Sequence, residues 1–351
     1  MGAHPKAPSL LEGGLALNEF IARSPSTILG ADTYGRALPF LFKILAADAP
    51  LSIQCHPSKE QAQAGFAREE AAGIRSDAPN RNYRDANHKP ELIVALEEFW
   101  ALKGFRDPKE IISLFTRARL HSAKPLLELL AKEDGLRAFY AQLLALTSEK
   151  TRILLSELNS GLNQLPEAEA RWSKELLARY PDDQSTTSAL ILRLVRLSAG
   201  EGLFVGAGEL HAYLSGTGLE IMANSDNVLR GGLTPKHVDP AELLRVLRFE
   251  YTPLEILHAE GVGPIGHYHT PCDEFTLSRL TLGVGEEAGY MPKLPCAQIW
   301  LCLGAGAELV WRGGSMSIER GDAVFVTADT KGLIAKATQD SCDVWIAGFG
   351  S

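Results

Sequence analysis

The chain has 351 residues, of which 45% are hydrophobic and 22% are charged, and these values exclude a disordered protein. At roughly 150 residues per domain, this length suggests about two domains. The chain carries 35 Lys and Arg residues against 43 Asp and Glu residues, a formal net charge of −8. This balance argues against nucleic acid as a partner, because binding to phosphate backbones requires concentrated positive charge.

No segment has the character of a membrane span or of a signal peptide. The apolar stretches Leu38–Ala47 and Ala189–Leu197 contain Lys or Arg and are much shorter than the roughly 20 residues needed to cross a bilayer. The cysteines are odd in number, widely spaced and without a CxxC pair, which favours reduced thiols. They are Cys55, Cys272, Cys296, Cys302 and Cys342. We therefore expect a cytoplasmic protein without a membrane partner.

The predicted elements change character twice along the chain. Between Pro39 and Phe105, short apolar runs bounded by Pro, Asn and Asp predict strands, interrupted by one helix that begins after Ser58 and ends near Gly73. From Pro108 to about Gly200, apolar residues recur at helical spacing, and Pro and Gly divide the region into four or five helices.

Strand patterns return at Gly202 and continue to the end of the chain. The expected strands of the tail are Ala297–Leu303, Ala307–Trp311, Met316–Ile318 and Ala323–Val326. A further short helix is expected after Asp239, which can cap its first turn. Two β-rich regions around one helical block predict a mainly β protein with a helical insertion, built as two barrels or as one barrel made twice.

The first candidate site lies in the run LSIQCH. Side chains alternate between the faces of a strand, so Ser52, Gln54 and His56 share one face. Burying such a polar row costs free energy unless its groups have partners. Metal binding and a hydrogen-bonded core cluster are both consistent with this pattern.

A second candidate is His88-Lys89-Pro90-Glu91, where Glu91 stands at the entrance of the expected strand ELIVAL. A carboxylate beside a Lys and a His is suited to metal binding or to proton transfer. The alternative is a solvated charge cluster ahead of the strand.

A third cluster runs from the expected strand that carries His211, through a next strand that carries Glu220, to a polar, glycine-rich loop with Asp226 and Arg230. Loops of this composition held between strands are common binding sites, although an Arg among Asp and Asn residues can also form a simple surface turn.

Taken together, Gln54, His56, Glu91 and His211 offer two imidazoles, one carboxylate and one amide oxygen. These donors suit a borderline divalent ion, zinc first, with manganese, cobalt or iron as alternatives. Three or four protein ligands plus water would form an open, catalytic metal site.

The segment His267-Tyr268-His269, with Glu274 five residues further on, has a metal-binding pattern of its own. Because Pro271 interrupts the run, we expect a surface loop here rather than a second metal site.

Four segments resemble type I mannose-6-phosphate isomerases (phosphomannose isomerases), which are zinc-dependent cupin enzymes. They are PFLFKILAADAPLSIQCHPSKEQA, HKPELIVAL, GELHAYLSGTGLEIMANSDNVLRGGLTPKHVD and EFTLSRL. The resemblance implies two cupin-like (jelly-roll) β-barrels plus an α-helical domain. It places a catalytic cupin barrel at 1–105 and 201–250, a helical insertion at 106–200 and a C-terminal cupin-like domain at 251–351. Relatives usually have several dozen residues before the MGAHPKAPS segment. Either the start codon of this sequence was assigned too late, or the catalytic barrel lacks its first strands.

The resemblance also implies the roles of individual residues. The implied ligands of one zinc ion are Gln54, His56, Glu91 and His211. Arg230 is implied to be catalytic, and Lys89, Glu220 and Asp226 to line the sugar site. Lys43 and Ser52 are implied to hold the substrate phosphate, with His88 nearby.

The implied activity is the interconversion of D-mannose 6-phosphate and D-fructose 6-phosphate by a monomer. Another metal-dependent cupin enzyme, or a non-catalytic sugar-binding cupin, is the alternative.

Overall fold

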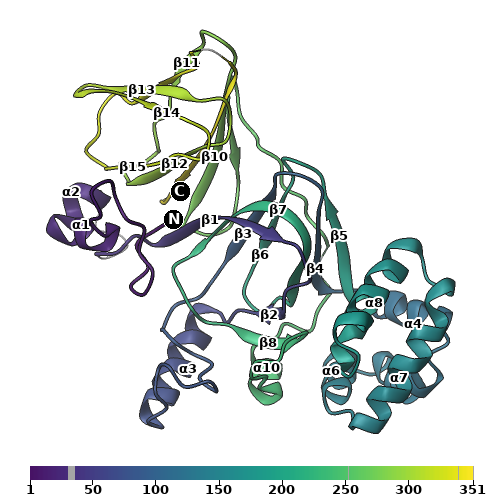
Figure 1. Ribbon diagram of the computed structural model, residues 1–351. Coiled ribbons are helices and arrows are strands. Elements are labelled where there is room, and N and C mark those ends of the chain that lie inside the picture. Colours follow the sequence, from purple (N-terminus) through teal and green to yellow (C-terminus); the bar gives the residue numbers. More distant parts are fainter. Residues whose placement is uncertain (31–35, 252, 339, 351) are drawn as a thin grey trace.

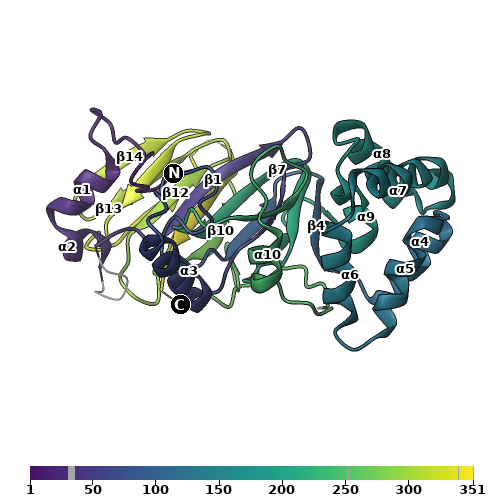
Figure 2. The ribbon, with the colours of Figure 1, turned by 90° about the horizontal axis from the view of Figure 1, so that it is seen from below.

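The computed structural model describes residues 1–30, 36–251, 253–338 and 340–350. Strands β1–β8 form the middle of the molecule, the helices α4–α9 form one end, and the strands β9–β17 form the other (Figure 1). Seen from below, these three parts lie in one row (Figure 2). The predicted fold class, mainly β with a helical insertion, is confirmed.

The first barrel is organised around one long strand, β7, which pairs antiparallel with β1, β2, β3 and β4. All five residues of β3 are buried, as expected for the continuous apolar run after Glu91. The strands are β1 (Phe40–Ala47), β2 (Ile53–Cys55), β3 (Glu91–Ala95), β4 (Phe99–Phe105), β5 (Leu192–Leu197), β6 (Gly202–Val205), β7 (His211–Ala223) and β8 (Leu229–Gly232).

The expectation that His211 and Glu220 lie in successive strands is wrong, because both belong to β7. The glycines between them permit close strand packing and do not make a turn. Gly216 has φ +111°, and a Cβ atom there would lie 2.5 Å from the carbonyl oxygen of Glu98. One continuous strand therefore carries two of the candidate site residues.

The predicted helix after Ser58 is α3 (Lys59–Ala71), and Ser58 and Gln61 cap it reciprocally. Asp239 caps α10 (Pro240–Val246) as expected. The helical block ends earlier than the sequence suggests, since Leu192–Leu197 is strand β5 paired with β4. The helices of the block are α4 (Pro108–Arg117), α5 (Lys124–Leu127), α6 (Gly135–Leu144), α7 (Ser148–Gly161), α8 (Glu167–Arg179) and α9 (Ser188–Ile191). Short 3₁₀ turns cover His121–Ala123, Glu128–Ala131, Leu162–Gln164 and Gln184–Thr187.

The second barrel consists of a five-stranded sheet, β15-β12-β17-β10-β9, and a four-stranded sheet, β11-β16-β13-β14. The four strands expected in the tail are present as β12 to β15. The strands are β9 (Ile265–Tyr268), β10 (Thr276–Leu282), β11 (Glu287–Gly289), β12 (Gln298–Cys302), β13 (Ala307–Trp311), β14 (Gly314–Ile318), β15 (Ala323–Val326), β16 (Ile334–Lys336) and β17 (Cys342–Gly348).

Two short helices near the N-terminus, α1 (Leu17–Arg23) and α2 (Pro25–Leu29), were not predicted, and they lie against the second barrel (Figure 1). The rings of Phe20 and Phe325 meet edge to face with centroids 6.3 Å apart. One apolar core contains Phe42 of β1 together with Leu277 and Trp345 of the second barrel. The two barrels therefore share buried surface.

Candidate metal centre

The first barrel brings three buried side chains of metal-binding type together. His56 follows β2, Glu91 begins β3 and His211 begins β7, and one potential ligand atom of each lies within 4.8 Å of the others. Within the part of the chain that the structure describes, no other group of three His, Cys, Asp or Glu residues meets this condition.

Glu91 is the centre of this group. Its Oε1 atom lies 3.1 Å from His56 Nε2 and 2.9 Å from Lys89 Nζ. Its Oε2 atom lies 3.5 Å from His211 Nε2 and accepts a hydrogen bond from the hydroxyl of Tyr213 at 3.3 Å. All five residues are buried, so these charges interact in a medium that screens them weakly.

Both imidazoles are oriented by backbone carbonyls. His56 Nδ1 lies 2.8 Å from the carbonyl oxygen of Asn227, and His211 Nδ1 lies 3.2 Å from that of Glu209. A carbonyl can only accept, so each Nδ1 carries a proton and each Nε2 presents a lone pair to Glu91. His56 Nε2 is buried and makes no hydrogen bond of acceptable geometry, so a cation between these groups would supply its missing partner.

The charge states of the group agree with cation binding. Burial lowers the pKa of His56 to about 4, so its imidazole is neutral at pH 7. Burial by itself would raise the pKa of Glu91, but the ammonium of Lys89 holds it well below its usual range, which leaves an ionised carboxylate. Neutral imidazole and carboxylate are the forms that bind zinc.

Gln54 lies next to this group in the strand register. In β2 it stands opposite His211 of β7 and opposite Arg230 of β8. Its amide nitrogen donates to Ser52 Oγ at 3.4 Å, which leaves the amide oxygen as the available ligand atom. The donor set of Gln54, His56, Glu91 and His211 fits zinc, which accepts nitrogen and oxygen ligands.

Three further residues suggested by the sequence, Lys43, Glu220 and Lys89, interact with one another beside Glu91. Lys43 of β1 stands opposite Glu220 of β7, and Lys43 Nζ lies 2.5 Å from Glu220 Oε2. Burial and the nearby Glu91 raise the pKa of Glu220. Burial would lower the pKa of Lys89, but Glu91 and Glu220 raise it, so its ammonium stays charged.

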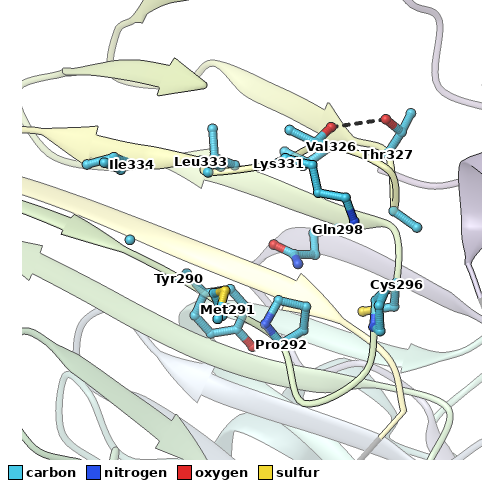
Figure 3. A pocket seen from close by; sticks show the side chains of 15 residues that line it. Tyr290, Met291, Pro292, Cys296, Gln298, Val326, Thr327, Lys331, Leu333 and Ile334 are labelled. Atoms are coloured by element: carbon cyan, nitrogen blue, oxygen red, sulfur yellow. Dashed lines mark hydrogen bonds between the residues drawn. The ribbon is translucent and has the colours of Figure 1, made fainter. Parts of the chain in front are cut away.

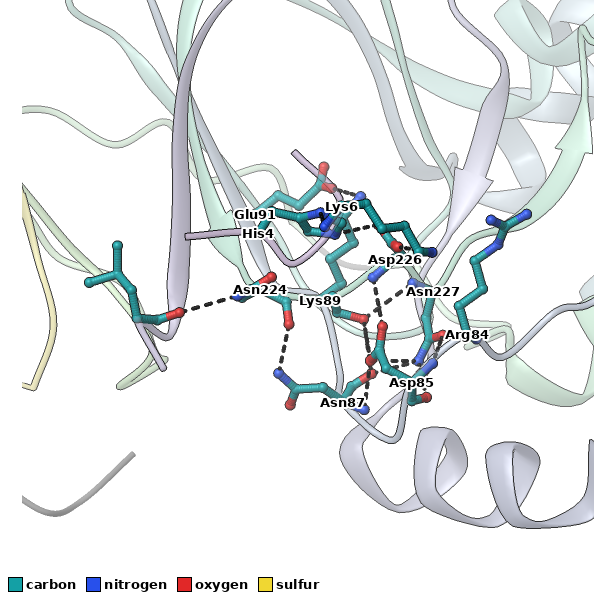
Figure 4. Close-up of polar contacts among 12 residues, drawn as sticks. His4, Lys6, Arg84, Asp85, Asn87, Lys89, Glu91, Asn224, Asp226 and Asn227 are labelled. Carbon is teal, nitrogen blue, oxygen red and sulfur yellow. Dashed lines mark hydrogen bonds and ion pairs between the residues drawn. The ribbon is translucent and has the colours of Figure 1, made fainter. Parts of the chain in front are cut away.

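Asp226 lies in the loop between β7 and β8, where residues near the N-terminus reach it (Figure 4). Its carboxylate lies 3.2 Å from both His4 Nε2 and Lys6 Nζ. Its backbone nitrogen donates to Asp85 Oδ2 at 2.8 Å. The sequence did not indicate His4 or Lys6, because more than 200 residues separate them from Asp226.

Asn227 joins the two loops that carry the site. Its Nδ2 donates to the carbonyl oxygens of Asp85 and Asn87 at 2.8 Å, and its Oδ1 accepts from the backbone nitrogen of Arg84 at 2.7 Å (Figure 4). It is fully buried. The side chain thus fixes the chain ahead of β3, while the carbonyl of the same residue orients His56.

Tyr213 was also missed, although a signal was present. It stands two residues after His211 in a strand, and two such residues share a face. Its buried hydroxyl donates a hydrogen bond to Glu91. Burial and the neighbouring carboxylates raise the pKa of Tyr213 well above the usual value of a tyrosine.

The structure separates Glu274 from the histidines with which the sequence grouped it. His267 belongs to strand β9, so the expected surface loop is wrong there, and its Nδ1 lies 2.8 Å from Ser278 Oγ. Glu274 is instead hydrogen-bonded to His88 Nε2, ahead of β3. Among the described residues, no third metal-binding side chain completes a site at His267 and His269.

A separate cavity of about 270 Å³ lies in the second barrel (Figure 3). Tyr290, Cys296, Gln298 and Lys331 are among its lining residues. None of the residues that the sequence suggested for the metal or sugar site borders it, so this cavity is distinct from the candidate metal centre.

No helix in the described ranges is long and apolar enough to cross a bilayer.

Comparisons with known proteins agree with this geometry. Residues 1–108 match the family profile "Phosphomannose isomerase type I, catalytic domain". Mannose-6-phosphate isomerase of Escherichia coli (strain K12) is 38% identical over 349 residues, covering 96% of this chain and 88% of that protein. Mannose-6-phosphate isomerase 1 of Arabidopsis thaliana is 32% identical over 361 residues, covering 94% of this chain and 80% of that protein.

Solved structures extend the likeness to the whole fold. The crystal structure of mannose 6-phosphate isomerase from Salmonella typhimurium, bound to its substrate fructose 6-phosphate and to zinc, has a TM-score of 0.90 and 35% identity, covering 100% of this chain and 90% of that one. A zinc-bound holo structure of mannose 6-phosphate isomerase has a TM-score of 0.89 and 34% identity, and it likewise covers 100% of this chain and 90% of that one. The zinc of these structures agrees with the group of His56, Glu91 and His211. By sequence and by fold, this chain belongs to the type I mannose-6-phosphate isomerase family.

Proposed function

We propose that this protein is a zinc-dependent aldose–ketose isomerase that interconverts D-mannose 6-phosphate and D-fructose 6-phosphate. The observation that carries the proposal is the convergence of His56, Glu91 and His211 around one buried point. The relative from Salmonella typhimurium binds fructose 6-phosphate and zinc on the same fold, which supports the substrate and the metal.

The proposed ligands of the ion are Gln54, His56, Glu91 and His211. A bound zinc ion supplies positive charge that stabilises negative oxygens of a substrate. Lys89 and Arg230 add charge of the same sign. Lys89 Nζ is held 2.9 Å from the ligand Glu91, and Arg230 stands opposite the ligand Gln54.

The reaction moves one proton between carbons. In the forward direction a base removes the proton from C2 of the open-chain aldose and returns it to C1, while the hydroxyl proton of O2 passes to O1. Negative charge develops on both oxygens in the enediolate between these steps, where Arg230 and Lys89 would stabilise it. Asp226 would line the sugar site and contact its hydroxyl groups.

The base must be able to accept a proton near neutral pH. Lys89 is a poor candidate because Glu91 and Glu220 raise its pKa against the effect of burial and keep it protonated. Glu220 is better suited, because burial and Glu91 raise its pKa above the usual value of a carboxyl group, which makes it a stronger base. His88 is the other candidate, since a neutral imidazole has one free nitrogen lone pair.

Lys43 and Ser52 are the proposed contacts of the substrate phosphate. Lys43 is partly exposed while its ammonium reaches the buried Glu220, so it stands between solvent and the site. Ser52 is next to the ligand Gln54. Holding the phosphate there would convert binding energy into orientation of the reacting carbons.

A coupled assay for fructose 6-phosphate tests the proposal. The protein should convert mannose 6-phosphate, lose the activity after chelation and regain it with added zinc. Fructose 6-phosphate supplied directly to the coupling enzymes, with the same chelator, controls for damage to the assay. A folded, zinc-loaded protein without turnover would refute the proposed reaction.

We further propose that the protein acts as a monomer in the cytoplasm. All five cysteines are unpaired in the structure, as thiols are in a reducing compartment.

A further inference from the structure

One charged side chain of the second barrel contacts His88, which lies three residues before Glu91 in the sequence. Glu274 lies in the segment between β9 and β10, and its carboxylate pairs with Nε2 of His88, 186 residues earlier in the chain. The two side chains are only 18% and 25% exposed. His88 directly precedes Lys89, whose ammonium contacts Glu91.

The sequence grouped Glu274 with His267 and His269, but in the structure its carboxylate binds His88. His267 is engaged with Ser278 instead. The hydrogen bond with His88 is the main reason that the pKa of Glu274 lies below its usual value, so this carboxylate is ionised at neutral pH. Lys59 and Glu60, at the start of α3, also lie close enough to the pair to interact with its charges.

An ionised carboxylate can only accept hydrogen bonds, so the proton between the two groups belongs to His88 Nε2. In the neutral ring this leaves Nδ1 as the basic nitrogen, and the ring can no longer turn freely. The tautomer and the orientation of a catalytic imidazole are commonly fixed in this way.

We propose that Glu274 is a positioning residue for the isomerase reaction, which holds His88 in the tautomer with a basic Nδ1 at the rim of the metal centre. The proposal rests on the proposed function for the catalytic use of His88. It makes the second barrel a contributor to the active site, because the orienting carboxylate comes from that barrel.

Another hydrogen bond joins the two barrels without involving the site. The hydroxyl of Tyr268 in β9 donates to the carbonyl oxygen of Gly200 at 2.8 Å. Tyr268→Phe removes one hydrogen bond between the barrels without touching His88, and it is therefore the matched control for Glu274→Gln.

The experiment compares Glu274→Gln, Glu274→Asp, His88→Gln, the double variant Glu274→Gln with His88→Gln, and Tyr268→Phe. Bound zinc and the unfolding midpoint establish that each variant is folded. We expect Glu274→Gln to lower kcat by about 10- to 100-fold, the range for loss of an orienting partner, while KM changes less than about twofold. Glu274→Asp should recover part of kcat, Tyr268→Phe should keep it, and Glu274→Gln should cause no further loss once His88 is already Gln.

The ring-nitrogen NMR shifts of His88 supply a second readout that does not depend on turnover. They should change in Glu274→Gln and stay constant in Tyr268→Phe. Unchanged shifts, a wild-type kcat in Glu274→Gln, or equal losses with and without His88 would each overturn the inference. If the wild type itself does not convert mannose 6-phosphate, the proposed function fails, and with it the catalytic part of the inference. The NMR shifts then still decide whether Glu274 orients His88.

Discussion

Gln54 and His211 stand directly opposite each other on the antiparallel strands β2 and β7. This register places an amide and an imidazole from distant segments on one side of the metal centre. The carboxylate of Glu91 enters from β3, which pairs with the other end of β7. Three of the four proposed ligands therefore lie in paired strands, and His56 directly follows β2. Such placement holds a metal site to narrow tolerances.

Removing His56 should remove the metal. His56→Ala deletes a ligand whose Nδ1 is already oriented by Asn227, and no described neighbour can replace its Nε2. We expect most bound zinc to be lost in a metal assay after dialysis. His237→Ala, at an exposed loop histidine, should keep the zinc of the wild type. Full zinc occupancy in His56→Ala would contradict the ligand set.

Arg230→Ala should separate catalysis from metal binding. Arg230 stands beside Gln54 in the register of β2 and β8 but supplies no metal ligand. We expect kcat to fall by about 10²- to 10³-fold, the usual loss for one preorganised charge-stabilising group, with zinc content unchanged. Arg152→Ala, on an exposed part of α7, serves as the control. An unchanged kcat in Arg230→Ala would remove its proposed role.

Lys43→Ala should mainly weaken recognition of phosphate. We expect the KM for mannose 6-phosphate to rise about 10- to 100-fold, in the range for hydrogen bonds to a charged group. Inhibition by inorganic phosphate should weaken in parallel, whereas inhibition by unphosphorylated mannose should stay within about twofold. Equal weakening toward both inhibitors would speak against phosphate binding at Lys43.

Asn227→Ala should destabilise the protein strongly. The change removes the side-chain partner of the carbonyl oxygen of Asp85 and of the backbone nitrogens of Arg84 and Asp85. The carbonyl oxygen of Asn87 loses one of two donors and keeps the hydroxyl of Ser225. Unpaired groups that are shielded from water cost up to about 1–3 kcal/mol each, so the unfolding midpoint should drop by several degrees. Asn163→Ala, at an exposed position, should shift it by less than about a degree. A midpoint like that of the wild type would show that the carbonyls find other partners.

Much of the fold could be predicted from local pattern. The strands of the tail and the capped helices after Ser58 and Asp239 depend on short-range signals, and they appear where expected. The break expected between His211 and Glu220 was wrong, because the glycines there serve close packing against Glu98, which no local pattern reveals. Helices α1 and α2 were missed because they are short and depend on contacts with the second barrel.

The candidate site also contains residues that could be predicted from the sequence and contacts that could not. His56, Glu91 and His211 are unusual residue types within apolar strands, so each could be singled out from the sequence. The partners of other candidate residues could not be predicted. His4 meets Asp226, and Glu274 meets His88, only through tertiary packing. The carbonyl of Asn227 carries no sequence signal, because every residue has such a group.

The apolar core that joins Phe42 to Leu277 and Trp345 has a consequence for the protein as a whole. Cutting the chain between the barrels would expose aromatic surface on both fragments, so neither fragment can be treated as a self-sufficient module. Heat or denaturant should melt the two barrels in a single cooperative step, and attempts to minimise the enzyme to its metal-binding half should yield an aggregating polypeptide.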